Sequence, residues 1–153
     1  MKNYNLFFLF LLCFFIGCKA KEGQIITTSE NNIDAARNFI RAALDGKFDE
    51  ARNFMLEDSS NINYMDVVER SFSKADYTVK EGYRTSSINI RSVTELNDSV
   101  TVVIYSNSYK NDHDTLRVVK QSDRWLVDLK YLYEHDEDAN KMETLLKDST
   151  NDK

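Results

Sequence analysis

Histidines and carboxylates are the first side chains to consider for chemistry, and both histidines of the chain lie in charged surroundings. His113 falls in an expected turn between strands, and His135 follows the last expected strand inside the acidic cluster Glu134–Asp138. Consecutive residues of one segment do not form the oxygen cage that calcium requires or the tetrahedral set that zinc requires. We therefore expect a solvated acidic tail, no metal site and no catalytic histidine.

Aromatic side chains are the next candidates, because phenols and indoles line many small-molecule pockets. Tyr64, Tyr105 and Trp125 are the residues expected to line a pocket or the core. An enzyme would have to use an unobvious acid or phenol, such as Asp76 or Tyr105. The chain has no glycine-rich phosphate loop, no Gly-x-Ser-x-Gly and no His-Glu-x-x-His, so we predict neither a cofactor nor a set of catalytic residues.

Cys18 is the residue with the most specific chemistry. It follows a basic start at Lys2 and an unbroken apolar run, Leu6–Ile16, which is too short to span a bilayer but typical of an export signal. Phe15-Ile16-Gly17-Cys18 resembles the lipobox of bacterial lipoproteins, which implies cleavage before Cys18 and acylation of its thiol. An ordinary secretory signal with incidental cysteines is the alternative.

Composition indicates one domain and excludes some partners. The 153 residues carry 20 Lys and Arg against 25 Asp and Glu, for a formal net charge of −5. This acidic balance disfavours nucleic acid and anionic membrane surfaces, which bind clustered basic residues. We divide the chain into a signal peptide (1–17), a tether (18–31), an α+β domain (32–133) and an acidic C-terminal tail (134–153).

The first half of the domain has helical periodicity. A helix capped by Asn31 or Asn32 is predicted to end at Gly46, and two more helices are predicted over Phe48–Leu56 and Ile62–Phe72. Arginines 37, 41 and 52 are expected on exposed helix faces.

The second half changes to a period of two. Four antiparallel strands are predicted, joined by turns at Asn97-Asp98, Lys110–Asp114 and Ser122-Asp123. In the last strand Asp128 alternates with apolar neighbours and is expected to point away from the core. Helices followed by a meander indicate an α+β fold with the helices on one face of the sheet. The four predicted strands are Ser87–Ile90, Val100–Tyr105, Thr115–Lys120 and Arg124–Tyr131.

Two stretches carry a family resemblance. Ala35–Ala51, with its Gly46-Lys47-Phe48 junction, resembles the opening of nuclear-transport-factor-2-like (NTF2-like) domains, and Asp114–Asp128, with Trp125, resembles their closing hairpin. Together with the lipobox, the chain is similar to the small DUF4878-like lipoproteins of bacteria. The resemblance implies an NTF2-like cone, in which three helices pack on a curved four-stranded antiparallel meander around a pocket or a filled core.

Two functions from different classes remain, because this fold hosts both enzymes and binding modules. The first is a lipid-anchored binding or protein-interaction module of the cell envelope, facing the periplasm and without catalytic activity. The second is a small isomerase, dehydratase or hydrolase acting in the cone. The candidate partners are the membrane, through lipidated Cys18, a second copy or another envelope protein, and a small apolar ligand.

Overall fold

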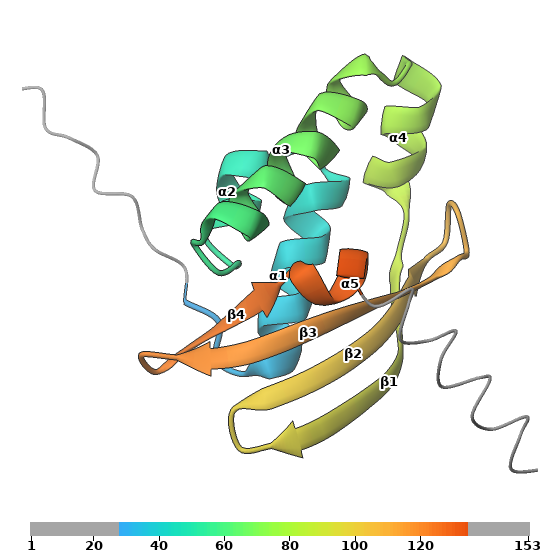
Figure 1. Cartoon of the computed structure of the whole chain (residues 1–153). Helices are drawn as coiled ribbons and strands as arrows, with labels where there is room; N and C mark the ends of the chain where they lie inside the picture. The colour runs from blue at the N-terminus through green and yellow to red at the C-terminus, as the bar shows by residue number, and fades with distance from the viewer. Residues whose placement is uncertain (1–27, 135–153) are drawn as a thin grey trace, which may run out of the picture.

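The computed structural model describes residues 28–134, which form one helical layer against one sheet (Figure 1). The predicted signal peptide, Cys18, His135 and most of the acidic tail lie outside these residues. Within them the chain is an α+β fold with an open, four-stranded antiparallel sheet, as predicted.

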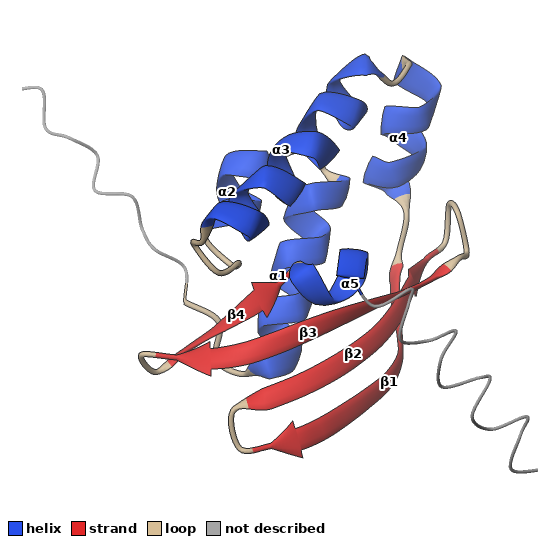
Figure 2. Ribbon diagram, viewed as in Figure 1, coloured by secondary structure: helices blue, strands red, loops and turns tan. Residues whose placement is uncertain are grey.

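Helices precede the four strands, as predicted, and there are two more helices than expected: α4 before the sheet and α5 after it (Figure 2). The helices are α1 (Asn32–Leu44), α2 (Phe48–Arg52), α3 (Ser59–Lys74), α4 (Tyr77–Thr85) and α5 (Lys130–Glu134). The strands are β1 (Ile88–Asn97), β2 (Val100–Asn107), β3 (His113–Gln121) and β4 (Arg124–Asp128), neighbours in that order.

Helix α1 begins and ends where its sequence signals predict. The Asn31 side chain accepts a hydrogen bond from the backbone N–H of Asp34 at 2.9 Å, and is the N-cap. Gly46 follows the helix with a φ of +74°, a conformation that glycine adopts without steric cost. One face of α1 is fully buried against the sheet and α2, and so forms the centre of the core.

The core fills the space between the helices and the covered face of the sheet. In the middle of the sheet the buried residues alternate, as Leu116 and Val118 do in β3 and Val103 does in β2, whereas the last three residues of β4 are all buried. Met65 is the contribution of α3, with 1% of its surface exposed. The segment 54–56 covers the outer edge of β4: the N–H of Val127 donates to the oxygen of Phe54 at 2.8 Å, and the N–H of Leu56 donates to Val127 at 2.9 Å.

Two sequence-based predictions are corrected here. The last strand ends at Asp128 and not at Tyr131, because the chain turns into α5 at Lys130. Asp128 was expected on the surface, but only 1% of it is exposed. Strand alternation does place Asp128 on the sheet face opposite Val127. On that face, however, the side chains of Arg117 and Asn61 hydrogen-bond to Asp128 and shield it from solvent.

Helix α4 was not predicted at all. Its N-cap, Asp76, accepts from the N–H of Val79 at 2.9 Å, and the helix buries none of its residues completely. It follows α3 directly and stands at the end of the molecule farthest from the β3–β4 turn (Figure 1). Because α4 packs only partially, it forms the wall of an open space and not part of the core.

Candidate functional site

An apolar groove between the helical layer and the sheet is the candidate site. Its volume is about 560 Å³, within the range of roughly 300–1,000 Å³ that small-molecule sites occupy. Four helices and β2 contribute to its walls, and almost every contributing side chain is apolar or aromatic. The lining residues are Phe39, Ile40, Ala43, Leu44, Met65, Val67, Val68, Ser71, Phe72, Ala75, Val79, Tyr83, Tyr105, Leu129 and Leu132.

A row of aromatic rings positions α4 against the rest of the molecule. The ring centroids of Phe48 and Phe72 lie 5.4 Å apart, those of Phe72 and Tyr83 6.5 Å, and those of Tyr83 and Tyr109 5.1 Å. The Tyr109 ring from the β2–β3 turn packs on Gly82, where a Cβ would lie only 2.4 Å from the ring. Glycine in the middle of α4 therefore permits this close approach.

Arg41 of α1 forms hydrogen bonds that hold the carboxyl end of α4 against α1. Its guanidinium donates to the backbone oxygens of Tyr83, Arg84 and Ser86 at 3.2, 3.1 and 2.7 Å, and it pairs with Asp45 at 2.7 Å. A cation at these carbonyls also complements the helix dipole. Arg41 was expected on an exposed face, but it is half-buried because α4 lies over it.

Tyr105 is the residue of the sheet that lines the groove, and Asp114, which is not a lining residue, lies beside it on the neighbouring strand. They are cross-strand partners in β2 and β3, so their side chains leave the same face of the sheet, and the Tyr105 hydroxyl donates to the Asp114 carboxylate. Burial, followed by the nearby charge of Asp112, raises the pKa of Asp114 above its usual range.

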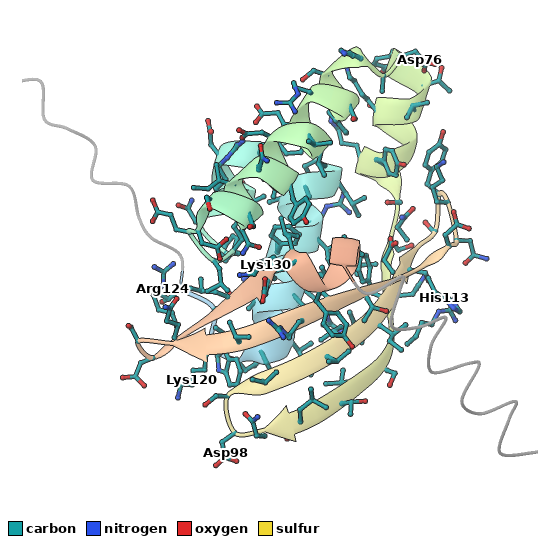
Figure 3. The ribbon with its side chains drawn as sticks, viewed as in Figure 1. Asp76, Asp98, His113, Lys120, Arg124 and Lys130 are labelled. Atoms are coloured by element: carbon teal, nitrogen blue, oxygen red, sulfur yellow. The ribbon has the colours of Figure 1, made fainter. Side chains whose placement is uncertain are left out.

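A second, separate polar cluster joins α3, β4 and α5. The buried Asn61 amide donates to Asp58 at 2.8 Å and to Asp128 at 3.3 Å, and its oxygen accepts from the N–H of Leu129 at 2.6 Å. Lys130 pairs with Asp58 at 3.0 Å, and Lys130 lies beside the start of α5 in Figure 3.

The charged groups of this cluster pair with one another, although the buried Nε of Arg117 has no hydrogen-bond partner among the described residues. The backbone N–H of Asn61 and the ammonium of Lys130 lower the pKa of Asp58 to about 2, and the bond to Asp58 raises the pKa of Lys130. Asp128 accepts a hydrogen bond from Arg117, whose guanidinium carbon lies 5.8 Å from the ring centre of Tyr131. The cluster therefore holds α5 and the start of α3 on the sheet, and it is a structural element.

The residues predicted to line a pocket or the core lie partly in the groove and partly against the core. Tyr105 lines the groove, whereas Tyr64 and Trp125 pack against the core as partly buried side chains. Asp76 caps α4 at the end farthest from the sheet, and His113 is exposed at the start of β3 (Figure 3). Neither Asp76 nor His113 is among the residues of the groove.

Arg52 also differs from its predicted exposed position. Its guanidinium donates to Glu69 at 2.6 Å and to Asp66 at 2.8 Å, so it joins α2 to α3. The hydrogen bond to Glu69 is the main cause of its raised pKa. Because these carboxylates occupy the guanidinium, Arg52 is not available to an anionic ligand.

Sequence reasoning missed Asp114, Val79 and Tyr83. Val79 and Tyr83 are four residues apart and so share one helix face. This spacing could have indicated a helix, but it is a weak signal because the residues around it are mostly polar. Asp114 was assigned to a turn, and only the register of β2 with β3 places it against Tyr105.

No known protein family, curated protein or solved structure matched the chain in our comparisons. Between residues 28 and 134, no helix has the length and apolar character needed to cross a membrane. The same residues contain no group of three or more histidine, cysteine, aspartate or glutamate side chains arranged to hold a metal ion.

Proposed function

We propose that this chain is a lipid-anchored binding domain of the bacterial cell envelope, with an apolar small molecule as the ligand of its groove. The observation that carries the proposal is the groove itself: about 560 Å³ of space lined by apolar and aromatic side chains. Concave apolar sites with a few polar groups are the usual form of small-molecule sites. Apolar surface that is exposed to water is unfavourable in free energy, and an apolar ligand would remove that surface from water on binding.

The NTF2-like cone belongs to the same proposal. A helical layer on one face of an antiparallel meander, with an apolar space between them, is the arrangement that the family resemblance implies. This space is not closed off from solvent, since Val67 of α3 lines it and is 47% exposed. A ligand could therefore enter without unfolding the core.

The envelope location is proposed from the sequence of residues 1–18. An acylated Cys18 would hold the domain at a periplasm-facing membrane surface through residues 19–31, close to a source of apolar molecules. Replacing Cys18 with Ser should move the protein from the membrane fraction to the soluble fraction of cells. If the C18S protein still sediments with membranes, lipid anchoring at this residue is wrong.

Ligand binding can be tested with an uncharged fluorescent probe. The chain from Lys19 onward should increase the fluorescence of N-phenyl-1-naphthylamine with saturation, because the dye enters the apolar groove. Val79→Trp fills the groove from α4 and should weaken binding roughly tenfold or more, as expected when a ligand loses its site. Thr78→Trp is the matched control: this neighbour on α4 is exposed and outside the groove, so its binding should equal that of the wild type.

Native mass spectrometry of gently purified protein gives an independent test. An additional stoichiometric mass that is present in the wild type and lost in V79W supports the proposal. If folded wild-type protein neither binds the dye nor carries an additional mass, the groove is not a ligand site and the proposed function is wrong. The same spectrum reports whether the chain forms a dimer.

A second candidate function is acid–base catalysis on the bound molecule. The observation that favours it is Asp114, a half-buried carboxyl with a raised pKa that is hydrogen-bonded to Tyr105 beside an apolar groove. An isomerase, dehydratase or hydrolase would release a changed molecule, so the compound recovered from the wild type should differ from that recovered from D114N. Identical compounds from both proteins would exclude this candidate.

A further inference from the structure

The described part of the chain ends beside the apolar groove. Leu132 of α5 is one of the residues that line the groove, and the last described residue, Glu134, follows it by two positions. Residues 135–153 continue the chain from this point. An extended chain covers about 3.3–3.6 Å per residue, so the five residues 135–139 reach about 17 Å. An apolar sequence that follows Glu134 closely is therefore within reach of the groove.

The sequence beyond Glu134 contains one apolar stripe with helical spacing, formed by Met142, Leu145 and Leu146. These positions recur at i, i+3 and i+4, and they are the large apolar residues of 135–153. The same spacing is the pattern by which an amphipathic helix places its apolar face in a hydrophobic groove. The groove fits such a face, because its lining side chains are almost all apolar and none carries a charge.

Charge gives a second, independent match, which lies outside the groove. Arg70 and Lys74 are exposed on α3, and each directly precedes a groove-lining residue. Neither takes part in the ion pairs found within residues 28–134. The acidic link, residues 134–138, carries four carboxylates and joins α5 to the sequence that holds the apolar stripe. Its negative charge favours a path of the link along this part of α3.

The distances along α3 are compatible with this path. Asn61 of α3 accepts a hydrogen bond from the N–H of Leu129 at 2.6 Å, which places the first turn of α3 beside the start of α5. Arg70 is nine residues further along α3, or about 14 Å at 1.5 Å per residue. The reach of about 17 Å for five extended residues covers this distance.

We propose that the C-terminal segment 134–147 of this chain covers its own groove when no ligand is bound. The acidic link runs along α3 past Arg70 and Lys74, and the apolar stripe inserts its side chains into the groove. Apolar groove surface is thereby removed from water. A ligand has to displace the stripe, so the segment lowers the affinity of the groove for apolar molecules. This inference goes beyond the proposed function, because it assigns a regulator of access to the same groove.

Disulfide crosslinking tests the position of the segment. The chain from Lys19 onward has no cysteine, because both cysteines of the sequence precede it. Val67→Cys/Leu146→Cys places one thiol at an exposed groove-lining position and the other on the apolar stripe. Asp123→Cys/Leu146→Cys is the control, since Asp123 is exposed in the β3–β4 turn and outside the groove. With oxygen and copper phenanthroline as oxidant, the intramolecular disulfide should form at least about tenfold faster in V67C/L146C, because the stripe raises the effective concentration there.

Dye binding tests whether the segment competes with a ligand. Leu145→Asp places a charge on the apolar stripe, whereas Thr144→Asp places the same charge on the opposite side of the expected helix. L145D should lower the Kd of N-phenyl-1-naphthylamine by about threefold or more, because the groove is then open in a larger fraction of molecules. T144D should bind the dye as the wild type does. Neither variant changes residues 28–134, so the groove itself is the same in both.

The outcomes separate this inference from the proposed function. Rapid intramolecular crosslinking in V67C/L146C together with tighter dye binding in L145D supports it. Equal crosslinking rates at Val67 and Asp123 overturn it, and so does equal dye affinity of L145D and T144D. A disulfide that joins two chains also overturns it, because the stripe then lies on a second copy. A rapid intramolecular crosslink without dye binding by any variant supports the covering segment and refutes the small-molecule function.

Discussion

The strongest stability prediction concerns Asn61, a fully buried amide in α3. Replacing Asn61 with Leu leaves the N–H of Leu129 buried without an acceptor and removes one donor from each of Asp58 and Asp128. An unsatisfied buried N–H costs about 1–3 kcal/mol, and the two lost carboxylate contacts bring the expected destabilisation to about 2–4 kcal/mol. This is a large fraction of the roughly 5–15 kcal/mol of a typical domain.

Urea unfolding of the chain from Lys19 onward, followed by circular dichroism and by Trp125 fluorescence, measures the effect. N61L should lower the free energy of unfolding by the amount above and the melting temperature by about 10–20 °C. The matched control is Asn63→Leu, the same substitution at an exposed position of α3, which should change stability by less than about 0.5 kcal/mol. If the two variants unfold within about 1 kcal/mol of each other, the polar cluster does not hold α3 to the sheet.

Three further predictions follow from packing and protonation. Trp125→Ala should cost about 2–3 kcal/mol in urea unfolding, less than for a fully buried indole, and no change would show that Trp125 does not pack on the core. The pKa of Asp58 is lowered to about 2, so the charged form stabilises the fold above about pH 4 and this contribution disappears as the pH falls towards 2. Asp58→Ala should therefore be destabilising at pH 6 and nearly neutral at pH 2 relative to wild type, and an equal effect at both pH values would contradict the reasoning. Gly82→Ala forces its Cβ against the Tyr109 ring and should destabilise by about 1–2 kcal/mol. In a Tyr109→Ala background the same change should become stabilising, because only the helix propensity of alanine remains, and a double-mutant cycle in thermal melts reports this change of sign.

Local signals explain which parts of the fold were predictable. The cap at Asn31, the 3.6-residue period of α1 and the turn at Gly46 act within a few residues of one another. The same holds for the tight β3–β4 turn, where Ser122 and Asp123 have φ values of 49° and 60°. The first three helices, the strand order and the antiparallel meander could therefore be predicted from the amino acids alone.

The groove depends on contacts between distant segments, which no local pattern specifies. Helix α4 escaped prediction because it has no fully buried residue, and its position depends on Tyr109 from the β2–β3 turn and on Arg41 from α1. The pairing of Asp114 with Tyr105 exists only in the observed register of β2 and β3.

Asp128 shows the same limit for burial. Strand alternation assigns a side chain to one of two faces, and it placed Asp128 opposite Val127 correctly. Whether that face is covered depends on elements from elsewhere in the chain, here Asn61 of α3 and Arg117 of β3. Amino-acid order thus determined the first helices, the four strands and the faces of their residues, whereas α4, the groove and the buried charges arose from packing, because they require side chains that are far apart in the chain to meet.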